Sequence, residues 1–282
     1  MYVYLEPKGG FNDILNVIKR TIVFCKETNR TLLLNTRKTC YKIDFKDYFY
    51  FKDININIIT DINIIKDIIT DTSLSIYPNI FEDRNINNWK FYLNKEIRSY
   101  LEEKTRTPMG LPDNNINDNI IISIGCWENK EDAILVFNSL YFNKNIIDHV
   151  NTQYNTLPKP YLCIQIRNTD YKCDYISLYE TNKYKIHSYN TIYIATDNKE
   201  SIEWFKSKGL SPYNFIEYPN NISRNLHHSD ISPDRKIKDL ICDIYIIAMA
   251  DELLSNSKGG FINLCNHIRE NPKLLADKFL TV

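Results

Sequence analysis

Short apolar runs alternate with segments of helical periodicity along the chain. Residues 1–5 predict a buried strand, and after a glycine turn residues 12–28 carry apolar side chains at roughly helical spacing. Residues 31–35 are the next apolar run. A strand, a helix and a second strand in this order predict a parallel pair with a right-handed crossover.

The same alternation returns after a proline-containing break at residues 157–160. The strands and helices that the pattern predicts beyond this break lie at residues 161–166, 191–196, 199–208, 236–250, 253–255 and from 260 onward. Before the break, the pattern predicts a buried strand at 120–125 and a helix at 143–155. Residues 41–116 are isoleucine-rich and follow no clear period.

This order of elements predicts an α/β fold, because strands separated by helices form parallel sheets that helices cover on both faces. We expect two Rossmann-type, doubly wound halves with a cleft between them. The N-terminal domain is predicted at residues 1–157 and the C-terminal domain at residues 158–282. In such sheets ligands bind at the carboxyl ends of the strands, so polar residues at strand ends are the first candidates for a site.

The composition narrows the class of protein. The 282 residues include 35 Lys and Arg and 35 Asp and Glu, so the formal net charge is zero. Proteins that bind nucleic acid through its phosphates normally carry a basic excess, and we expect no nucleic-acid partner. The 7 cysteines are scattered without a CxxC pair, which favours a reducing compartment.

Membrane and metal signals are weak. The first residues do not resemble a signal peptide, and no apolar run reaches the roughly 18 residues of a membrane span. We therefore expect a cytoplasmic protein without a membrane span. His227 and His228 are adjacent, and no third ligand follows at metal spacing, so no metal site is predicted. The oligomeric state stays open.

The strongest candidate for a functional residue is Arg167. It follows the apolar run 161–166 directly, and Asp170 comes three residues later. A guanidinium at the carboxyl end of a strand offers a planar, permanently charged fork that matches a phosphate or carboxylate. The alternative is a surface arginine that caps a loop.

Glycines mark a second candidate, the loop between the first strand and its helix. Gly9 and Gly10 would let the backbone approach a ligand closely, and amides at a helix start favour anions. The residues that follow are Asn12 and Asp13, and either of them would also suit a helix N-cap.

Carboxylates mark two more positions. Asp197 follows the predicted strand 191–196, where it would either cap the next helix or accept hydrogen bonds from a base or a sugar. Asp243 lies on the apolar helix 236–250 and needs a partner, because an unpaired buried carboxylate is costly.

The last candidate is the polar loop between the strand at 253–255 and the final predicted helix. It contains Ser255, Asn256 and Ser257, followed by Lys258 and two glycines. Hydroxyls, exposed amides and the helix dipole suit a phosphate cradle. The alternative is an ordinary glycine-bearing turn.

Taken in order, these motifs resemble those of the GDP-fucose-dependent fucosyltransferases of the α-1,2, α-1,6 and protein O-linked types. Residues 167–171 (Arg-Asn-Thr-Asp-Tyr) look like their arginine element. Residues 242–251 look like the helix before their serine-rich loop, and residues 254–257 like that loop. Residues 9–13 resemble their glycine-rich N-terminal loop. The resemblance covers the C-terminal half and the first 35 residues.

This resemblance implies a GT-B-like, inverting, metal-independent transferase that moves L-fucose from GDP-fucose to a hydroxyl of a glycan or glycolipid acceptor. It implies no cofactor beyond the nucleotide-sugar donor. Arg167 would bind the β-phosphate, Asp197 would meet the guanine or ribose, and Ser255 and Ser257 would meet the phosphates. The candidates for a general base are Asp13, Asp170 and Asp174.

Two departures from the family leave alternatives open. Gln165 stands where the family usually has a histidine near the base, and Lys258-Gly259-Gly260 replaces its more usual residues. Both are consistent with the same fold using another nucleotide-sugar donor. A third interpretation is a non-catalytic protein that binds a carbohydrate or a nucleotide.

Overall fold

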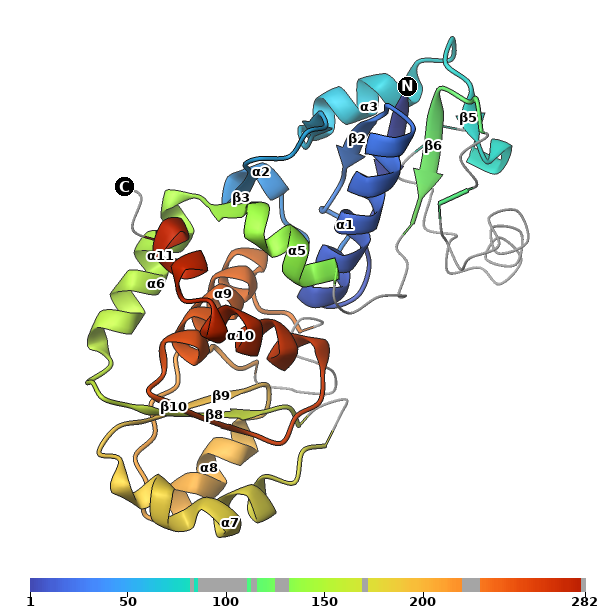
Figure 1. The fold of residues 1–282 in the computed structure, drawn as a ribbon. Coiled ribbons are helices and arrows are strands. Elements are labelled where there is room, and N and C mark those ends of the chain that lie inside the picture. Colours follow the sequence, from blue (N-terminus) through green and yellow to red (C-terminus); the bar gives the residue numbers. More distant parts are fainter. Residues whose placement is uncertain are drawn as a thin grey trace. The chain divides into compact units, whose positions relative to one another are not determined.

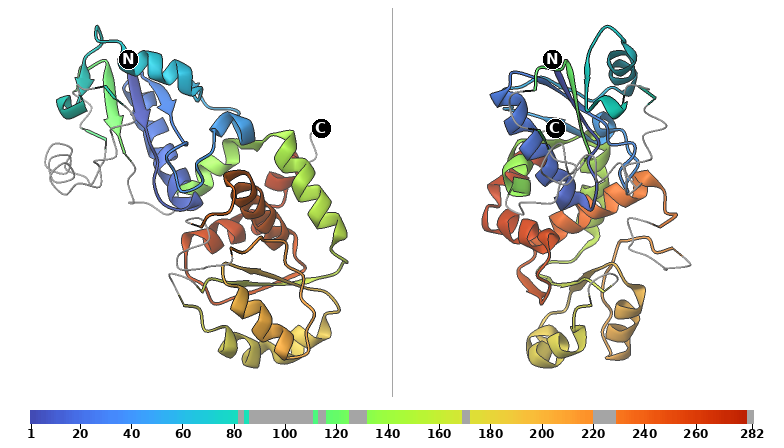
Figure 2. Two further views of the ribbon diagram at one scale, coloured as in Figure 1. Left: turned by 180° about the vertical axis from the view of Figure 1, so that it is seen from behind. Right: turned by 90° about the vertical axis from the view of Figure 1, so that its right-hand side faces the viewer.

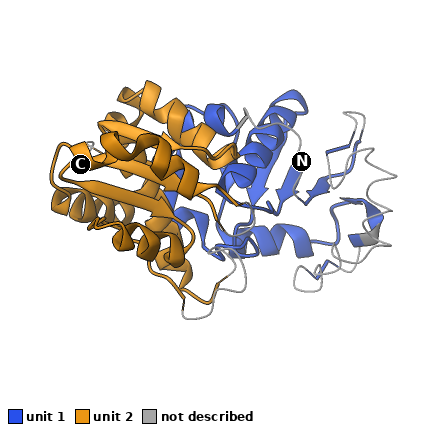
Figure 3. Cartoon of the chain, turned by 90° about the horizontal axis from the view of Figure 1, so that it is seen from below, with its two compact units in different colours: residues 1–141 blue, residues 142–282 orange. Residues whose placement is uncertain are grey.

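The computed structural model of the chain describes residues 1–81, 84–85, 111–112, 116–124, 132–168, 172–219 and 229–279. They form an α/β fold with parallel sheets (Figure 1). The chain divides into two compact units, residues 1–141 and residues 142–282 (Figure 3).

Parallel strands form one sheet in the described part of unit 1, in the order β4-β2-β1-β6-β5. These strands are β1 (Tyr2–Leu5), β2 (Thr31–Leu34), β4 (Ile58–Ile59), β5 (Ile76–Tyr77) and β6 (Ile120–Ser123). The predictions at 1–5, 31–35 and 120–125 are confirmed. Tyr2 lies opposite Thr31 on one side and Ile120 on the other, so β1 is a central strand.

The remaining described elements of unit 1 lie outside this sheet. They are α1 (Phe11–Glu27), α2 (Phe45–Tyr48), β3 (Phe49–Phe51), α3 (Ile62–Thr70), the 3₁₀ turn η1 (Asn79–Phe81), α5 (Asp132–Ser139) and β7 (Leu140–Phe142), which pairs with β3. The predicted helix at 12–28 is confirmed as α1. α3 was not predicted. Its buried residues Ile62, Ile65 and Ile69 have helical spacing, but the 48% exposed Ile64 among them hides the period.

Unit 2 contains a second parallel sheet, with the order β10-β8-β9 among its described residues. The strands β8 (Leu162–Ile166), β9 (Ile192–Thr196) and β10 (Glu252–Ser255) confirm the three predicted in this half. β8 is the central strand and is buried along its whole length. Beyond β9 the chain returns at Tyr213, whose N–H donates to the Ile192 carbonyl at 2.8 Å and whose carbonyl accepts from Ile194 at 2.9 Å.

Helices cover both faces of this sheet. They are α6 (Lys144–Thr156), α7 (Tyr175–Ser188), α8 (Lys199–Ser207), α9 (Pro233–Met249), α10 (Gly260–Glu270) and α11 (Lys273–Phe279). α7 and α8 lie on one face, and α9 and α10 lie on the other (Figures 1 and 2). α7 was not predicted, because Tyr179 and Ile186 are its buried residues and so short an apolar stripe gives a weak period.

The division between the units falls before α6, whereas the sequence analysis places the domain boundary after this helix, at residue 157. α6 packs on α9 of unit 2, where the rings of Tyr154 and Tyr245 meet edge to face with centroids 5.0 Å apart. The residues at 157–160 connect α6 to β8.

Candidate functional site

The carboxyl ends of three neighbouring strands meet at one edge of the unit 2 sheet. β8 leads into Arg167, β9 into Asp197, and β10 ends at Ser255. In the register of the sheet, Gln165 lies opposite Ser255 on one side and Ala195 on the other. Residues predicted from separate motifs therefore come together, as expected for ligand-binding groups in a parallel α/β sheet.

A hydrogen-bonded chain connects β8 to the loop after β10. The Ser255 hydroxyl donates to the Gln165 side-chain carbonyl at 2.7 Å, and the Ser257 N–H donates to the Ser255 hydroxyl at 3.1 Å. Gln165 is only 5% exposed, so these bonds fix its amide inside the sheet edge. The Asn256 side chain donates instead to the carbonyl of Asp174 at 2.8 Å, which ties the loop to the start of α7.

The Arg167 guanidinium lies against the start of α10. A β-carbon placed on Gly259 would be 3.2 Å from Arg167 Nη1 and 3.9 Å from the Ser257 hydroxyl. Gly259 is the N-cap residue of α10 and brings no side chain to its first amides. A guanidinium, a hydroxyl and a helix N-terminus at one place suit the oxygens of a phosphate.

Sequence reasoning treated Gly259 as a departure from the family motif and missed this role. Its φ of −82° suits any residue, so conformational freedom is not the reason for a glycine here. A β-carbon here would instead crowd the Arg167 guanidinium. The available signal was a glycine between a strand-end loop and a helix, but the partner that crowds it, Arg167, is far away in the sequence.

Asp197 organises the residue that follows Arg167. Its carboxylate accepts a hydrogen bond from the Asn168 N–H at 2.7 Å, which joins the ends of β8 and β9. The helix cap that the sequence analysis considered for Asp197 is supplied by Asn198, which accepts from the Ser201 N–H at 2.9 Å. Asp197 is thus positioned at the sheet edge beside the arginine strand.

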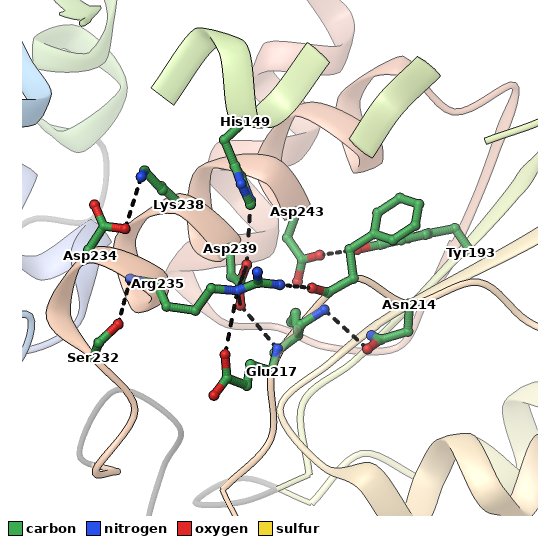
Figure 4. Close-up of polar contacts among 12 residues, drawn as sticks. His149, Tyr193, Asn214, Glu217, Ser232, Asp234, Arg235, Lys238, Asp239 and Asp243 are labelled. Carbon is green, nitrogen blue, oxygen red and sulfur yellow. Dashed lines mark hydrogen bonds and ion pairs between the residues drawn. The ribbon is translucent and has the colours of Figure 1, made fainter. Parts of the chain in front are cut away.

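Asp243 lies away from this edge, between α9 and the middle of β9 (Figure 4). It has the partner that its position requires, because the Tyr193 hydroxyl donates to it at 2.6 Å. Burial, reinforced by the nearby Asp239, raises the pKa of Asp243 from its ordinary value of 3.8 to about 8, although the bond from Tyr193 opposes the shift. The geometry favours a supporting role for this carboxylate.

A neighbouring ionic network holds residues 213–218, the segment that follows the return of the chain beside β9 (Figure 4). Asp239 is 3% exposed in its side chain and pairs with Arg235 at 2.8 Å. It also accepts from the Glu217 N–H at 3.0 Å, while Arg235 donates to the Phe215 carbonyl at 2.6 Å. His149 Nε2 lies 3.5 Å from the same carboxylate.

That segment brings Tyr218 to the strand end, a placement that the sequence did not predict. The Tyr218 hydroxyl donates to the carbonyl of Thr196 at 2.7 Å, directly before Asp197. Burial raises the pKa of this phenol, and the carboxylates of Asp243, Asp197 and Asp239 raise it further. Tyr218 therefore stays neutral, and its ring lies beside the carboxyl end of β9.

The glycine loop of unit 1 is built around its helix start. Asp13 stands in the first turn of α1 and accepts from the N–H of Gly10, the N-cap residue, at 3.0 Å. Gly9 has a φ of +90°, and a β-carbon there would be 2.7 Å from the Asp13 carboxylate. Asn12 is 8% exposed. The capping interpretation of Asp13 thus has a direct contact.

Asp170, a predicted site residue, lies outside the described part of the chain, as do His227 and His228, where no metal site was predicted. Among the residues that the structure describes, no cluster of three or more His, Cys, Asp or Glu side chains suits a metal ion. In the same part of the chain, no helix has both the length and the apolar character that crossing a bilayer requires.

Solved structures of fucosyltransferases share this fold. NodZ alpha-1,6-fucosyltransferase soaked with GDP-fucose aligns with a TM-score of 0.60 at 15% identity, over 94% of this chain and 91% of that chain. Fucosyltransferase NodZ from Bradyrhizobium aligns with a TM-score of 0.59 at 16% identity, over 94% and 92%. POFUT1 in complex with GDP-fucose aligns with a TM-score of 0.55 at 12% identity, over 95% and 94%.

The fold thus defines an α/β protein with parallel sheets of the type found in GT-B fucosyltransferases. This chain has a fucosyltransferase-like fold, which confirms the resemblance found in its motifs. No protein-family model matches the chain, and no curated protein matches its sequence.

Proposed function

We propose that the chain is an inverting, metal-independent glycosyltransferase whose donor is GDP-fucose and whose acceptor is a glycan or glycolipid hydroxyl. The observation that carries the proposal is the Arg167 guanidinium beside Gly259 and Ser257, at the start of α10. This grouping lies at the strand ends of a fold that is shared by NodZ soaked with GDP-fucose and by POFUT1 in complex with GDP-fucose.

In the proposed reaction, unit 2 binds the donor diphosphate. Arg167 would stabilise the negative charge that develops on the leaving β-phosphate, which is the task of a metal ion in other transferases. The Ser257 hydroxyl and the first amides of α10 would donate to further phosphate oxygens. Ser255 would hold the loop in this position through its bonds to Gln165 and Ser257.

At the other end of the donor, Asp197 would accept hydrogen bonds from the guanine or the ribose. One of its oxygens already accepts from the Asn168 N–H, so the carboxylate is held in place before the ligand arrives. Gln165, Asn256 and Asp243 would act behind these groups, since each is hydrogen-bonded within the unit.

The acceptor hydroxyl would attack the anomeric carbon opposite the diphosphate, which inverts the configuration. A general base must reach that hydroxyl. We propose Asp13 on the glycine loop or Asp170 for this role, with Gly9, Gly10 and Asn12 shaping the loop. Asp174, the third candidate, caps α7 by accepting from the Ser177 N–H at 2.9 Å, much as Asp13 accepts from the Gly10 N–H at the start of α1.

A cytoplasmic location is part of the proposal. It rests on cysteines that form no disulfide among the described residues, namely Cys25, Cys163, Cys173, Cys242 and Cys265. Such thiols are typical of a reducing compartment.

The test is calorimetric titration of GDP and UDP, in the presence of EDTA, into the wild type and Arg167→Ala. We expect micromolar GDP binding that the substitution weakens by about 2–4 kcal/mol, the scale of losing one partner of a buried charge pair. Arg167→Lys keeps the charge without the planar fork, and its loss should be intermediate.

A matched control is Lys185→Ala, which removes a cation from the exposed pair with Glu252 on the same unit. Its GDP affinity should stay within about 0.5 kcal/mol of wild type. A preference for UDP would keep the transferase and change the donor. If the wild type binds neither nucleotide, the proposed function is wrong.

A further inference from the structure

Residues 213–218 extend the unit 2 sheet beyond β9, on the side opposite to β8. Tyr213 pairs with Tyr193 in the parallel direction. Further along, the Tyr218 hydroxyl donates to the carbonyl of Thr196, the last residue of β9. The segment therefore advances in step with β9 and reaches the carboxyl edge of the sheet at Tyr218. This is the edge at which parallel α/β sheets bind their ligands.

The Tyr218 side chain is held in one orientation. Its hydroxyl donates to the Thr196 carbonyl at 2.7 Å and accepts from the Asn214 side chain at 3.3 Å. The same Asn214 amide donates to the Ile194 carbonyl at 2.7 Å, so the anchor of the phenol is itself fixed to β9. The ring packs against the apolar cluster that lies between the sheet and α7 and α8, and the residue is half-buried. A fixed aromatic ring thus keeps part of its surface in solvent at the strand ends.

A purely structural role accounts for only part of this arrangement. An aliphatic side chain would pack against the same cluster, so packing alone does not require an aromatic ring. What the anchored phenol adds is a rigid, flat surface at a ligand-binding edge, and flat aromatic surfaces suit planar ligands. The Asp239 carboxylate and the Arg235 guanidinium also fix the main chain of the segment. Such preorganisation is typical of a binding site.

The order of groups along the edge gives a direction to a bound nucleotide. Ser257 and Gly259 follow β10, Arg167 follows β8, Asp197 follows β9, and Tyr218 ends the segment beyond β9. Neighbouring strands lie about 4.8 Å apart, so the segment lies about 10 Å from β8. An extended nucleoside diphosphate spans such a distance between its β-phosphate and its base. A diphosphate on Arg167 therefore directs the base toward Tyr218.

We propose that the base of the nucleotide-sugar donor stacks on the ring of Tyr218, and that this contact selects a purine over a pyrimidine. The inference rests on the proposed function, because the diphosphate on Arg167 sets the direction of the ligand. A purine has a larger flat face than a pyrimidine and gains more from stacking on an aromatic ring. Tyr218 is thus a specificity-determining residue that contacts the base and takes no part in the transfer step.

The experiment titrates GDP, UDP and inorganic pyrophosphate into the full chain in the presence of EDTA. We expect the wild type to bind GDP about tenfold more tightly than UDP. Tyr218→Leu should weaken GDP binding about tenfold, the scale of losing one base–aromatic contact, and UDP binding by less. Pyrophosphate has no base, so its affinity should not change. Equal binding of GDP and UDP by the wild type, or unchanged GDP binding by Tyr218→Leu, would overturn the inference.

Tyr218→Phe separates the ring from its hydroxyl, because it keeps the flat surface and removes both hydrogen bonds. Its preference for GDP over UDP should remain, and a loss as large as in Tyr218→Leu would contradict the stacking role. A matched control is Tyr213→Leu on the same segment. Tyr213 is 36% exposed and pairs with β9 through its main chain, which the substitution keeps. Its GDP affinity should equal that of wild type.

The pyrophosphate titration distinguishes stacking from damage to the sheet edge. If Tyr218→Leu loses pyrophosphate and GDP binding by the same factor, the edge is disturbed and the inference is wrong. Arg167→Ala in the same titrations keeps the two proposals distinguishable. GDP binding that needs Arg167 and ignores Tyr218→Leu overturns this inference alone. A purine preference that needs Tyr218 and ignores Arg167→Ala overturns the diphosphate assignment and leaves the base contact standing.

Discussion

At the scale of single residues, Gly259 and Arg167 depend on each other. The space for the guanidinium exists because residue 259 has no β-carbon, and an added one would be 3.2 Å from Nη1, tighter than most such contacts. A side chain at this position therefore has to displace the group that we propose to bind the diphosphate.

Gly259→Ala should weaken GDP binding about three- to tenfold, because the guanidinium must shift by a few tenths of an ångström. Thermal unfolding should change little, since the N-cap preference of glycine over alanine is worth at most about 1 kcal/mol. Calorimetry and a melting curve measured on the same sample test both statements. Unchanged GDP affinity would show that the guanidinium does not contact the ligand from this position.

The raised pKa of Asp243 predicts that the stability of the protein depends on pH. Its pKa is raised from 3.8 to about 8 in the folded protein, so the folded state holds a proton that the unfolded state has lost between those values. The free energy of unfolding of the wild type should therefore fall as the pH rises from about 4 to about 8. One proton contributes up to about 1.4 kcal/mol per pH unit.

Asp243→Asn removes this titration and keeps an oxygen that accepts from the Tyr193 hydroxyl. Urea denaturation at pH 5 and pH 8 should show a smaller loss of stability in the variant, which becomes the more stable protein at pH 8. Equal slopes for the two proteins would mean that Asp243 is ionised in the folded state throughout this range.

At the scale of elements, β8, β9 and β10 could be predicted from the sequence nearly to the residue. β8 and β9 are buried along their whole length, and strands buried on both faces read as continuous apolar runs. The ends of those strands then pointed to Arg167 and Asp197. The segment beside β9 was not predictable, since its anchors are the distant side chains of Asp239 and Arg235 and a single main-chain pairing at Tyr213.

Asp197 has two separable roles at the junction of β8 and β9. Asp197→Asn keeps an acceptor for the Asn168 N–H and loses the charge, so GDP affinity should fall about tenfold with little change in melting temperature. Asp197→Ala also leaves that N–H without its acceptor and should destabilise the protein by about 1 kcal/mol. A normal GDP affinity in Asp197→Asn would remove Asp197 from the proposed donor site.

At the scale of the whole molecule, alternating strands and helices correctly predicted an α/β fold with parallel sheets, and the order of the motifs pointed to the fucosyltransferase-like fold. Contacts between segments that are distant in the sequence could not be predicted. The convergence of Lys8 and Lys38 on Glu6 is one example, and the bond from Asn256 to Asp174 is another. Neither has a signature in spacing or periodicity.

The return of the chain at Tyr213 also affects how the protein meets other molecules of its kind. An uncovered outer strand exposes a row of backbone groups on which a second chain can add a strand and begin to aggregate. Tyr213 occupies the backbone groups of Ile192 and Ile194, so that route is blocked along this part of β9. Conditions that break the interactions of Asp239 with Arg235 and Glu217 would therefore expose the edge of β9. Aggregation should then begin before the sheet itself unfolds.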